Sequence, residues 1–108
     1  GNEAQVDVVT LPQAASVPFG TVVIAATATA QQLPIYTAKQ GVIVVANENN
    51  DAANIVYLGF SNAVTNATYL KQLLPGEATP LLPVTNSDVI WVYCIFAGGT
   101  HSYNYAVL

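Results

Sequence analysis

The stretch DVIWVYCIFAGGTHSYNYAVL, residues 88–108, decides the fold class because it has the pattern of two β-strands around a glycine turn. Residues 88–97 and 100–108 are rich in β-branched and aromatic side chains, which favour strands. Gly98-Gly99 between them suits a primed two-residue turn. The sequence therefore predicts a terminal β-hairpin whose register is set by this turn.

The predicted register separates the residues of this hairpin onto two faces, because side chains alternate along a strand. One face is apolar and is expected to line the core, whereas the other mixes large aromatic side chains with small polar ones and is expected to be covered by a partner. The core face contains Ile90, Val92, Cys94, Phe96, His101, Tyr103, Tyr105 and Val107, and the outer face contains Trp91, Tyr93, Ile95, Ser102, Asn104 and Ala106.

The β pattern extends toward the N-terminus. Residues 20–29 alternate apolar and polar side chains, residues 42–46 are apolar on both faces, and residues 55–60 are predicted to be the partner strand of 42–46. Leu73 to Glu77 carries Pro and Gly at the positions that a tight turn requires. With no helical periodicity, the chain is predicted to be all-β: a two-sheet antiparallel β-sandwich, jelly-roll-like, with an extended N-terminal arm.

The domain organisation follows from length and from the prolines. A chain of 108 residues is one domain with room for a core. Pro12 and Pro18 bracket a stretch of small residues that suits extended backbone, and residues 5–11 have strand character. We therefore expect an N-terminal arm over residues 1–19 and a single β-sandwich domain over residues 20–108.

The charge content excludes two classes of partner. Only 7% of the residues are charged, against about 25% in typical soluble domains. Lys39 and Lys71 are the only cations apart from the single histidine, and the formal net charge is −4. Nucleic-acid binding and attraction to anionic membranes both rest on cations, so neither nucleic acid nor membrane is an expected partner. The longest apolar run is too short for a transmembrane helix.

Catalytic and metal-binding residues are not expected. His101 and Cys94 are each alone in their class, and we interpret both as structural residues of a sheet. A Ser-His-Asp site using Ser61 or Ser102 has no supporting local motif. The loop of residues 47–51 (NENND) offers oxygen ligands that suit calcium, but a solvated loop is the preferred interpretation. No cofactor is expected.

The low charge also indicates association with other chains. Soluble monomers use surface charge to stay apart from their copies. Strands that are apolar on both faces leave surface for another chain to cover. We therefore expect a homo-oligomer, a subunit docked on a larger assembly, or both.

The order of features from Gly41 onward resembles the small head-decoration (cement) proteins of tailed bacteriophages. The features are GVIVVAN, an Asn-rich loop, NIVYLGFS, LLPGE, DVIWVYCIF, and GGT before a Tyr-rich strand. The resemblance implies a non-enzymatic structural protein that binds the major capsid protein on the outer surface of the virion. It also implies a homo-oligomer, dimer or trimer, that stabilises the head.

On the pattern of that family, the capsid-binding residues are expected on the arm and on exposed sheet faces. We assign this role to Val6, Val8, Leu11, Trp91 and Tyr93. The alternative is a carbohydrate- or surface-binding β-sandwich module, such as a fibre or tail component, because Trp91, Tyr93, Tyr103 and Tyr105 are candidates for an aromatic sugar platform.

Overall fold

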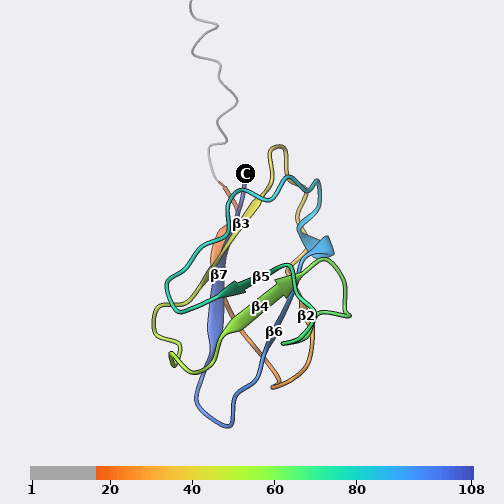
Figure 1. Cartoon of the computed structure of the whole chain (residues 1–108). Helices are drawn as coiled ribbons and strands as arrows, with labels where there is room; N and C mark the ends of the chain where they lie inside the picture. The colour runs from red at the N-terminus through yellow and green to blue at the C-terminus, as the bar shows by residue number, and fades with distance from the viewer. Residues whose placement is uncertain (1–16) are drawn as a thin grey trace, which may run out of the picture.

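The computed structural model describes residues 17–108, which form seven short β-strands and one turn of 3-10 helix, η1 (Ser87–Val89). The strands pair antiparallel in two sheets, as the sequence predicts. The first sheet has the order β1-β7-β3 and the second has the order β2-β6-β4-β5 (Figure 1). The strands are β1 (Phe19–Val23), β2 (Gln31–Gln32), β3 (Val42–Ala46), β4 (Val56–Gly59), β5 (Lys71–Leu73), β6 (Trp91–Cys94) and β7 (Ser102–Val107).

The strand order is that of a jelly roll. Residues 78–82 run antiparallel to the free side of β3 through the bridges Val45↔Ala78 and Val42↔Leu82. Counting this segment, the antiparallel pairs are nested: β1 with β7, β2 with β6, β3 with 78–82, and β4 with β5. Nested pairs of this kind arise when one long two-stranded hairpin is rolled up. The first and third pairs then lie in one sheet, and the second and fourth pairs lie in the other. The predicted two-sheet sandwich of jelly-roll type is therefore confirmed.

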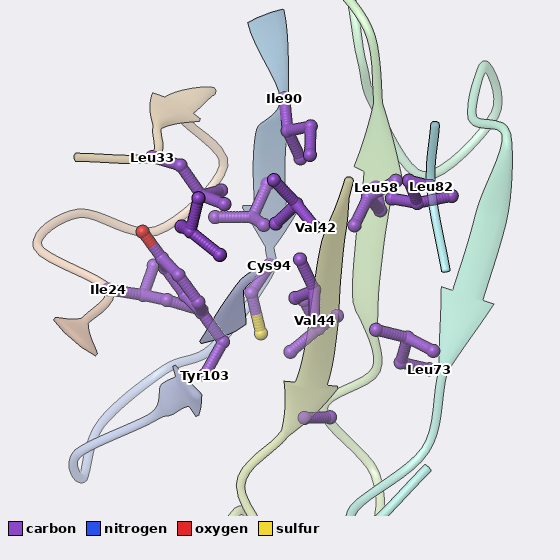
Figure 2. Packing of buried hydrophobic residues seen from close by; sticks show 14 of the residues in the cluster. Ile24, Leu33, Val42, Val44, Leu58, Leu73, Leu82, Ile90, Cys94 and Tyr103 are labelled. Carbon is purple, nitrogen blue, oxygen red and sulfur yellow. The ribbon is translucent and has the colours of Figure 1, made fainter. Parts of the chain in front are cut away.

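The core lies between the two sheets and is formed by alternate residues of each strand. Figure 2 shows side chains from both sheets, such as Val44 and Leu58, meeting in this layer. Burying an aliphatic side chain of this kind contributes about 1.5–3 kcal/mol. The fully buried apolar residues are Val42, Val44, Ala46, Val56, Leu58, Leu73, Ile90, Val92, Cys94 and Tyr103.

The terminal hairpin predicted over residues 88–108 is wrong in its strand pairing. The predicted division of its residues between a core face and an outer face is right. β6 and β7 lie in different sheets, and residues 95–101 carry the chain from one sheet to the other. The amide of Phe96 donates to Thr27 Oγ1 rather than to a β7 residue. In a hairpin, the apolar faces of the two strands would lie next to each other in one sheet and would need a further layer to cover them. In the sandwich, the apolar faces of β6 and β7 belong to opposite sheets and face the layer between them, which removes both from water.

Two further predictions need correction. Residues 55–60 do not pair with 42–46, because β4 pairs with β5 and β6 while β3 pairs with β7. The alternating segment 20–29 is a strand only to Val23, and the chain then crosses toward the second sheet. Ala28 lies in this crossing, exposed and with φ of 52°, rather than on the core face.

The turn predicted at residues 73–77 is confirmed. The amide of Glu77 donates to the carbonyl of Leu74 at 2.9 Å, and Gly76 has φ of 85°. Pro75 and Gly76 thus occupy the two central positions of a turn that needs a positive φ at the second of them. Of the predicted N-terminal arm, residues 1–16 lie outside the described part of the chain, and Phe19 is the first residue of β1.

Candidate functional site

The outer face of the second sheet carries a row of aromatic side chains. Tyr57 on β4 lies directly opposite Tyr93 on β6, and Trp91 lies two residues along β6 on the same face. The rings of Tyr57 and Tyr69 are 5.0 Å apart at an interplanar angle of 49°. These four residues, Tyr57, Tyr69, Trp91 and Tyr93, form what we call the aromatic strip. Trp91 and Tyr93 are half-buried, so both present ring surface to a partner.

A groove lies beside the aromatic strip, where residues 60–70 fold over the end of β4. Val64 covers Gly59, and a side chain at Gly59 would meet Val64 at 3.0 Å. The groove has a volume of about 280 Å³ and an apolar lining with few polar groups. Its lining residues are Gly59, Phe60, Ser61, Ala63, Val64, Thr68, Tyr69 and Leu70.

The outer face of the first sheet is apolar and bears no charged side chain. In β1, Phe19 is 78% exposed and Val23 is 55% exposed. Ile43 and Val45 on β3 are only half-buried, so one of the two apolar faces of this strand is partly uncovered. We call this surface the first-sheet face; by register it consists of Phe19, Thr21, Val23, Ile43, Val45, Ser102, Asn104 and Ala106.

Several polar groups of the first-sheet face have hydrogen-bond partners within the protein. Thr21 Oγ1 donates to Asn104 Oδ1 at 2.7 Å, and Asn47 Nδ2 donates to the same oxygen at 3.4 Å. Asn50 Nδ2 donates to the Ser102 carbonyl and Asn50 Oδ1 accepts from the Ser102 amide. Because these groups already form hydrogen bonds within the chain, another protein can cover them without leaving them buried and unpaired.

His101 is buried between neighbouring side chains of the fold. Its ring lies 4.8 Å from that of Phe96, which the sequence predicts to be on the same core face. Its Nε2 lies 2.9 Å from the Asn54 side-chain nitrogen, within hydrogen-bond distance. The backbone carbonyl of Asp88 accepts a hydrogen bond from Gln32 Nε2. Within residues 17–108, no hydrogen bond joins His101 to Asp88 or to a serine hydroxyl.

Cys94 lies in the core with no exposed surface. Burial raises the pKa of its thiol from the ordinary 9.0 to about 11. A thiol held in the protonated form is a poor nucleophile, because the thiolate is the reactive species. The structure therefore agrees with the interpretation of Cys94 as a small core hydrophobe.

We expect Cys94 to resist alkylation by a maleimide at pH 8 in the native protein and to react at once in denaturant. The raised pKa also makes stability depend on pH. Between pH 9 and 11 the unfolded thiol loses its proton while the folded thiol keeps it, so the free energy of unfolding falls as pH rises through this window. Urea titrations at pH 8 and above measure the effect, and Cys94→Ala should reduce it. Fast alkylation without denaturant would contradict this burial.

The loop of residues 47–51 uses its polar side chains to hold its own backbone. Asn47 Oδ1 accepts from the Asn49 amide, and Asp51 Oδ1 accepts from the Ala53 amide. These are local turns of the kind that Asn and Asp form readily. Among the described residues there is no group of three or more His, Cys, Asp and Glu side chains that could hold a metal ion. The same part of the chain has no helix long and apolar enough to span a membrane.

The structure separates the five predicted interface residues into two groups. Trp91 and Tyr93 lie on the outer face of the second sheet, as the alternation of β6 predicts. Val6, Val8 and Leu11 lie outside the described residues. The predicted grouping of Trp91 and Tyr93 with Tyr103 and Tyr105 as one platform is wrong, because Tyr103 is buried in the core and Tyr105 stacks on Tyr36.

Sequence reasoning placed Ser102, Asn104 and Ala106 on an outer face, but it missed Tyr57 and Tyr69 of the aromatic strip and the β1 members of the first-sheet face. Tyr57 alternates with the buried Val56 and Leu58, a signal that places it on the outer face, but its position beside Tyr93 depends on the pairing of β4 with β6. The first-sheet face is assembled from β1, β3 and β7, which are far apart in sequence.

Comparisons with a set of protein-family models, with curated proteins and with solved structures each find no match to this chain.

Proposed function

We propose that this protein is a structural virion protein: an oligomeric decoration, or cement, subunit that binds the major capsid protein on the outside of the head and stabilises it. The observation that carries the proposal is that so small a jelly roll has two outer faces suited to a partner, the first-sheet face and the aromatic strip. Exposed apolar patches rimmed by polar groups are typical of protein-binding surfaces. The resemblance of residues 41–108 to phage head-decoration proteins supports the choice of a capsid as the partner.

The mechanism is stabilisation by binding. A subunit that binds only the assembled lattice adds its binding free energy to the assembled state, and many copies multiply this effect. Apolar faces without charge are suited to this role, because their burial stabilises a complex at high salt as well as at low salt. The aromatic strip supplies ring surface of the type that is enriched at the centres of interfaces.

Density-gradient sedimentation of a lysate from the native source tests the proposal, with this chain followed by mass spectrometry. We expect the chain to migrate with particles of megadalton size and to be released from them by mild denaturant. Migration as a free small oligomer at the top of the gradient would contradict a virion role.

Trp91→Ala should weaken docking to the particle by about tenfold or more, since aromatic side chains are frequent hot spots. The melting temperature should change far less, because Trp91 is on the outer face of β6 and its neighbours Val92 and Ile90 form the core. A binding titration on stripped particles and a thermal melt measure the two effects.

Trp91→Phe is the matched control, because it keeps an aromatic ring on the same face, and it should retain most of the docking affinity. A large fall in melting temperature with docking intact would show that Trp91 stabilises the fold rather than the complex.

The second candidate is a carbohydrate- or surface-binding module, and the aromatic strip is the observation that favours it. Sugars stack on exposed rings, and Tyr57, Tyr93 and Trp91 lie on one face of the same sheet. This function predicts a change in the fluorescence of Trp91 when glycans of the host surface are added, and docking to the capsid lattice alone does not.

A further inference from the structure

The two sheets formed by residues 17–108 have four edges, and three of them carry features that prevent pairing with another strand. Exposed edges are commonly blocked by proline, by lysine or by shortness. β2 has two residues and is followed by Pro34, and β5 begins with Lys71. The segment 78–82 beside β3 contains Pro80 and is followed by Pro83.

The fourth edge, β1, is not blocked along its length. Its sequence FGTVV has no proline and no charged residue. Of the strands that the structure describes, β1 pairs with β7 alone, and on its other side the Gln31 side chain bonds the Val23 carbonyl and the Ala25 amide at the end of the strand. Phe19 and Val23 on this edge are also among the most exposed large apolar side chains of residues 17–108.

The register shows which backbone groups point away from β7. The amide of Val107 donates to the Pro18 carbonyl, and the amide of Ile24 donates to the His101 carbonyl. Hydrogen-bonded pairs alternate along an antiparallel ladder, so the even-numbered residues of β1 bond to β7. The amides and carbonyls of the odd-numbered residues, Phe19, Thr21 and Val23, therefore face the free edge.

This edge is complementary to itself. If two copies of β1 run antiparallel about a two-fold axis at Thr21, each Thr21 lies opposite the other Thr21 and each Phe19 lies opposite a Val23. Every paired residue then has its backbone groups directed at the partner, as a hydrogen-bonded pair requires. The Val23 carbonyl already accepts from Gln31 Nε2 at 3.1 Å, but its amide is free to donate to the Phe19 carbonyl of the other copy.

The side chains agree with this arrangement. Residues directly opposite each other in an antiparallel pair share a face, so the exposed Phe19 of one copy meets the exposed Val23 of the other. No charges oppose each other across the axis, because β1 has none. A two-fold contact of this kind uses the same patch on both copies, as isologous dimers do.

We propose that a second copy of this chain pairs with the free edge of β1, antiparallel and centred on Thr21, so that two first sheets become one continuous sheet. The inference rests on the self-association that belongs to the proposed function, and it does not require the capsid. The dimer joins two first-sheet faces into one larger and mostly apolar surface.

Amide exchange measured by NMR on the purified full-length protein tests the pairing over a dilution series. We expect the Thr21 amide to exchange about tenfold more slowly at the concentrated end than at the dilute end. The Val22 amide is the internal control, because it bonds to β7 within one chain and should be protected at every concentration. Thr21 exchange that is fast throughout would overturn the proposal. Protection independent of concentration would also overturn it, since another part of the same chain would then cover the edge.

Two variants at the centre of the contact complete the test by sedimentation velocity. Thr21→Pro removes the amide that the dimer uses without removing a bond to β7, and it should be monomeric at all concentrations. Thr21→Val loses the hydroxyl bond to Asn104 but keeps the amide, and it should still associate. A dimer that persists in Thr21→Pro would place the contact elsewhere and overturn the proposal.

If Thr21→Pro loses the protection of the Val22 amide, Val23→Lys replaces it, because a charge on this edge blocks pairing from the exposed face. Association of Val23→Lys equal to that of the native chain would likewise overturn the proposal. These measurements use the purified protein, so a negative result overturns the β1 dimer but says nothing about binding to particles. Conversely, an absence of co-sedimentation overturns the virion role but says nothing about the β1 dimer.

Discussion

Gly41→Ala should lower the free energy of unfolding by about 3 kcal/mol or more. Gly41 directly precedes β3 and has φ of 153°, a conformation that residues with a side chain rarely adopt. A Cβ at this position would overlap the carbonyl oxygen of Leu82. That oxygen accepts the amide of Val42, so the overlap acts directly on the pairing between β3 and the segment 78–82. Urea unfolding followed by tryptophan fluorescence measures the change.

Gly98→Ala is the matched control for this prediction. A Cβ at Gly98 would meet no atom within 4 Å. The substitution should change stability by less than about 0.5 kcal/mol, as is usual for surface positions without special geometry. Equal effects at Gly41 and Gly98 would mean that the path of the chain around Leu82 differs from the one described.

Leu58→Ala should destabilise the protein by about 2–5 kcal/mol, because it removes a large side chain from the layer between the sheets and leaves a cavity. Leu58 is fully buried on β4 and faces that layer together with Val44 of the opposite sheet (Figure 2). Thermal and urea unfolding measure the loss, and a lower melting temperature with an unchanged urea dependence is the expected form of the result.

Leu70→Ala is the control of identical chemistry, since Leu70 is 56% exposed beside the groove. It should change stability by about 0.5 kcal/mol or less. If Leu70→Ala were as destabilising as Leu58→Ala, the assignment of inner and outer faces in the second sheet would be wrong.

Local pattern predicted the faces of the strands correctly in most places. Val92 and Cys94 are buried while Trp91 and Tyr93 are half-exposed, as alternation along β6 requires. The turn at Pro75 and Gly76 was also predictable, because proline and glycine each restrict or permit backbone angles within one residue. Such features depend on neighbours in sequence, so the sequence alone is sufficient to find them.

The pairing of the strands was not predictable in the same way. Gly98-Gly99 has the composition of a hairpin turn, yet the flanking strands lie in different sheets. Both strands have an apolar face, and a hairpin or a sandwich satisfies the local preferences equally. The choice depends on burial against β1, β3 and β4, which no local pattern records.

The candidate surfaces show the same division. Trp91 and Tyr93 were placed on an outer face by alternation, which the structure confirms, and were assigned to an interface on the basis of the resemblance. The aromatic strip as a set, with Tyr57 beside Tyr93, exists only because β4 pairs with β6. The first-sheet face depends equally on β7 lying between β1 and β3.

The sequence by itself determined that this protein is all-β, that it carries very little charge, and which sides of β6 and β7 face the core. Those properties follow from composition and from the two-residue period of a strand. Only the tertiary structure decided the nested jelly-roll pairing, the make-up of the two outer faces and the unblocked edge at β1. These depend on contacts between residues that are distant in sequence, and the free energy that selects among them comes from burying both sheets against each other.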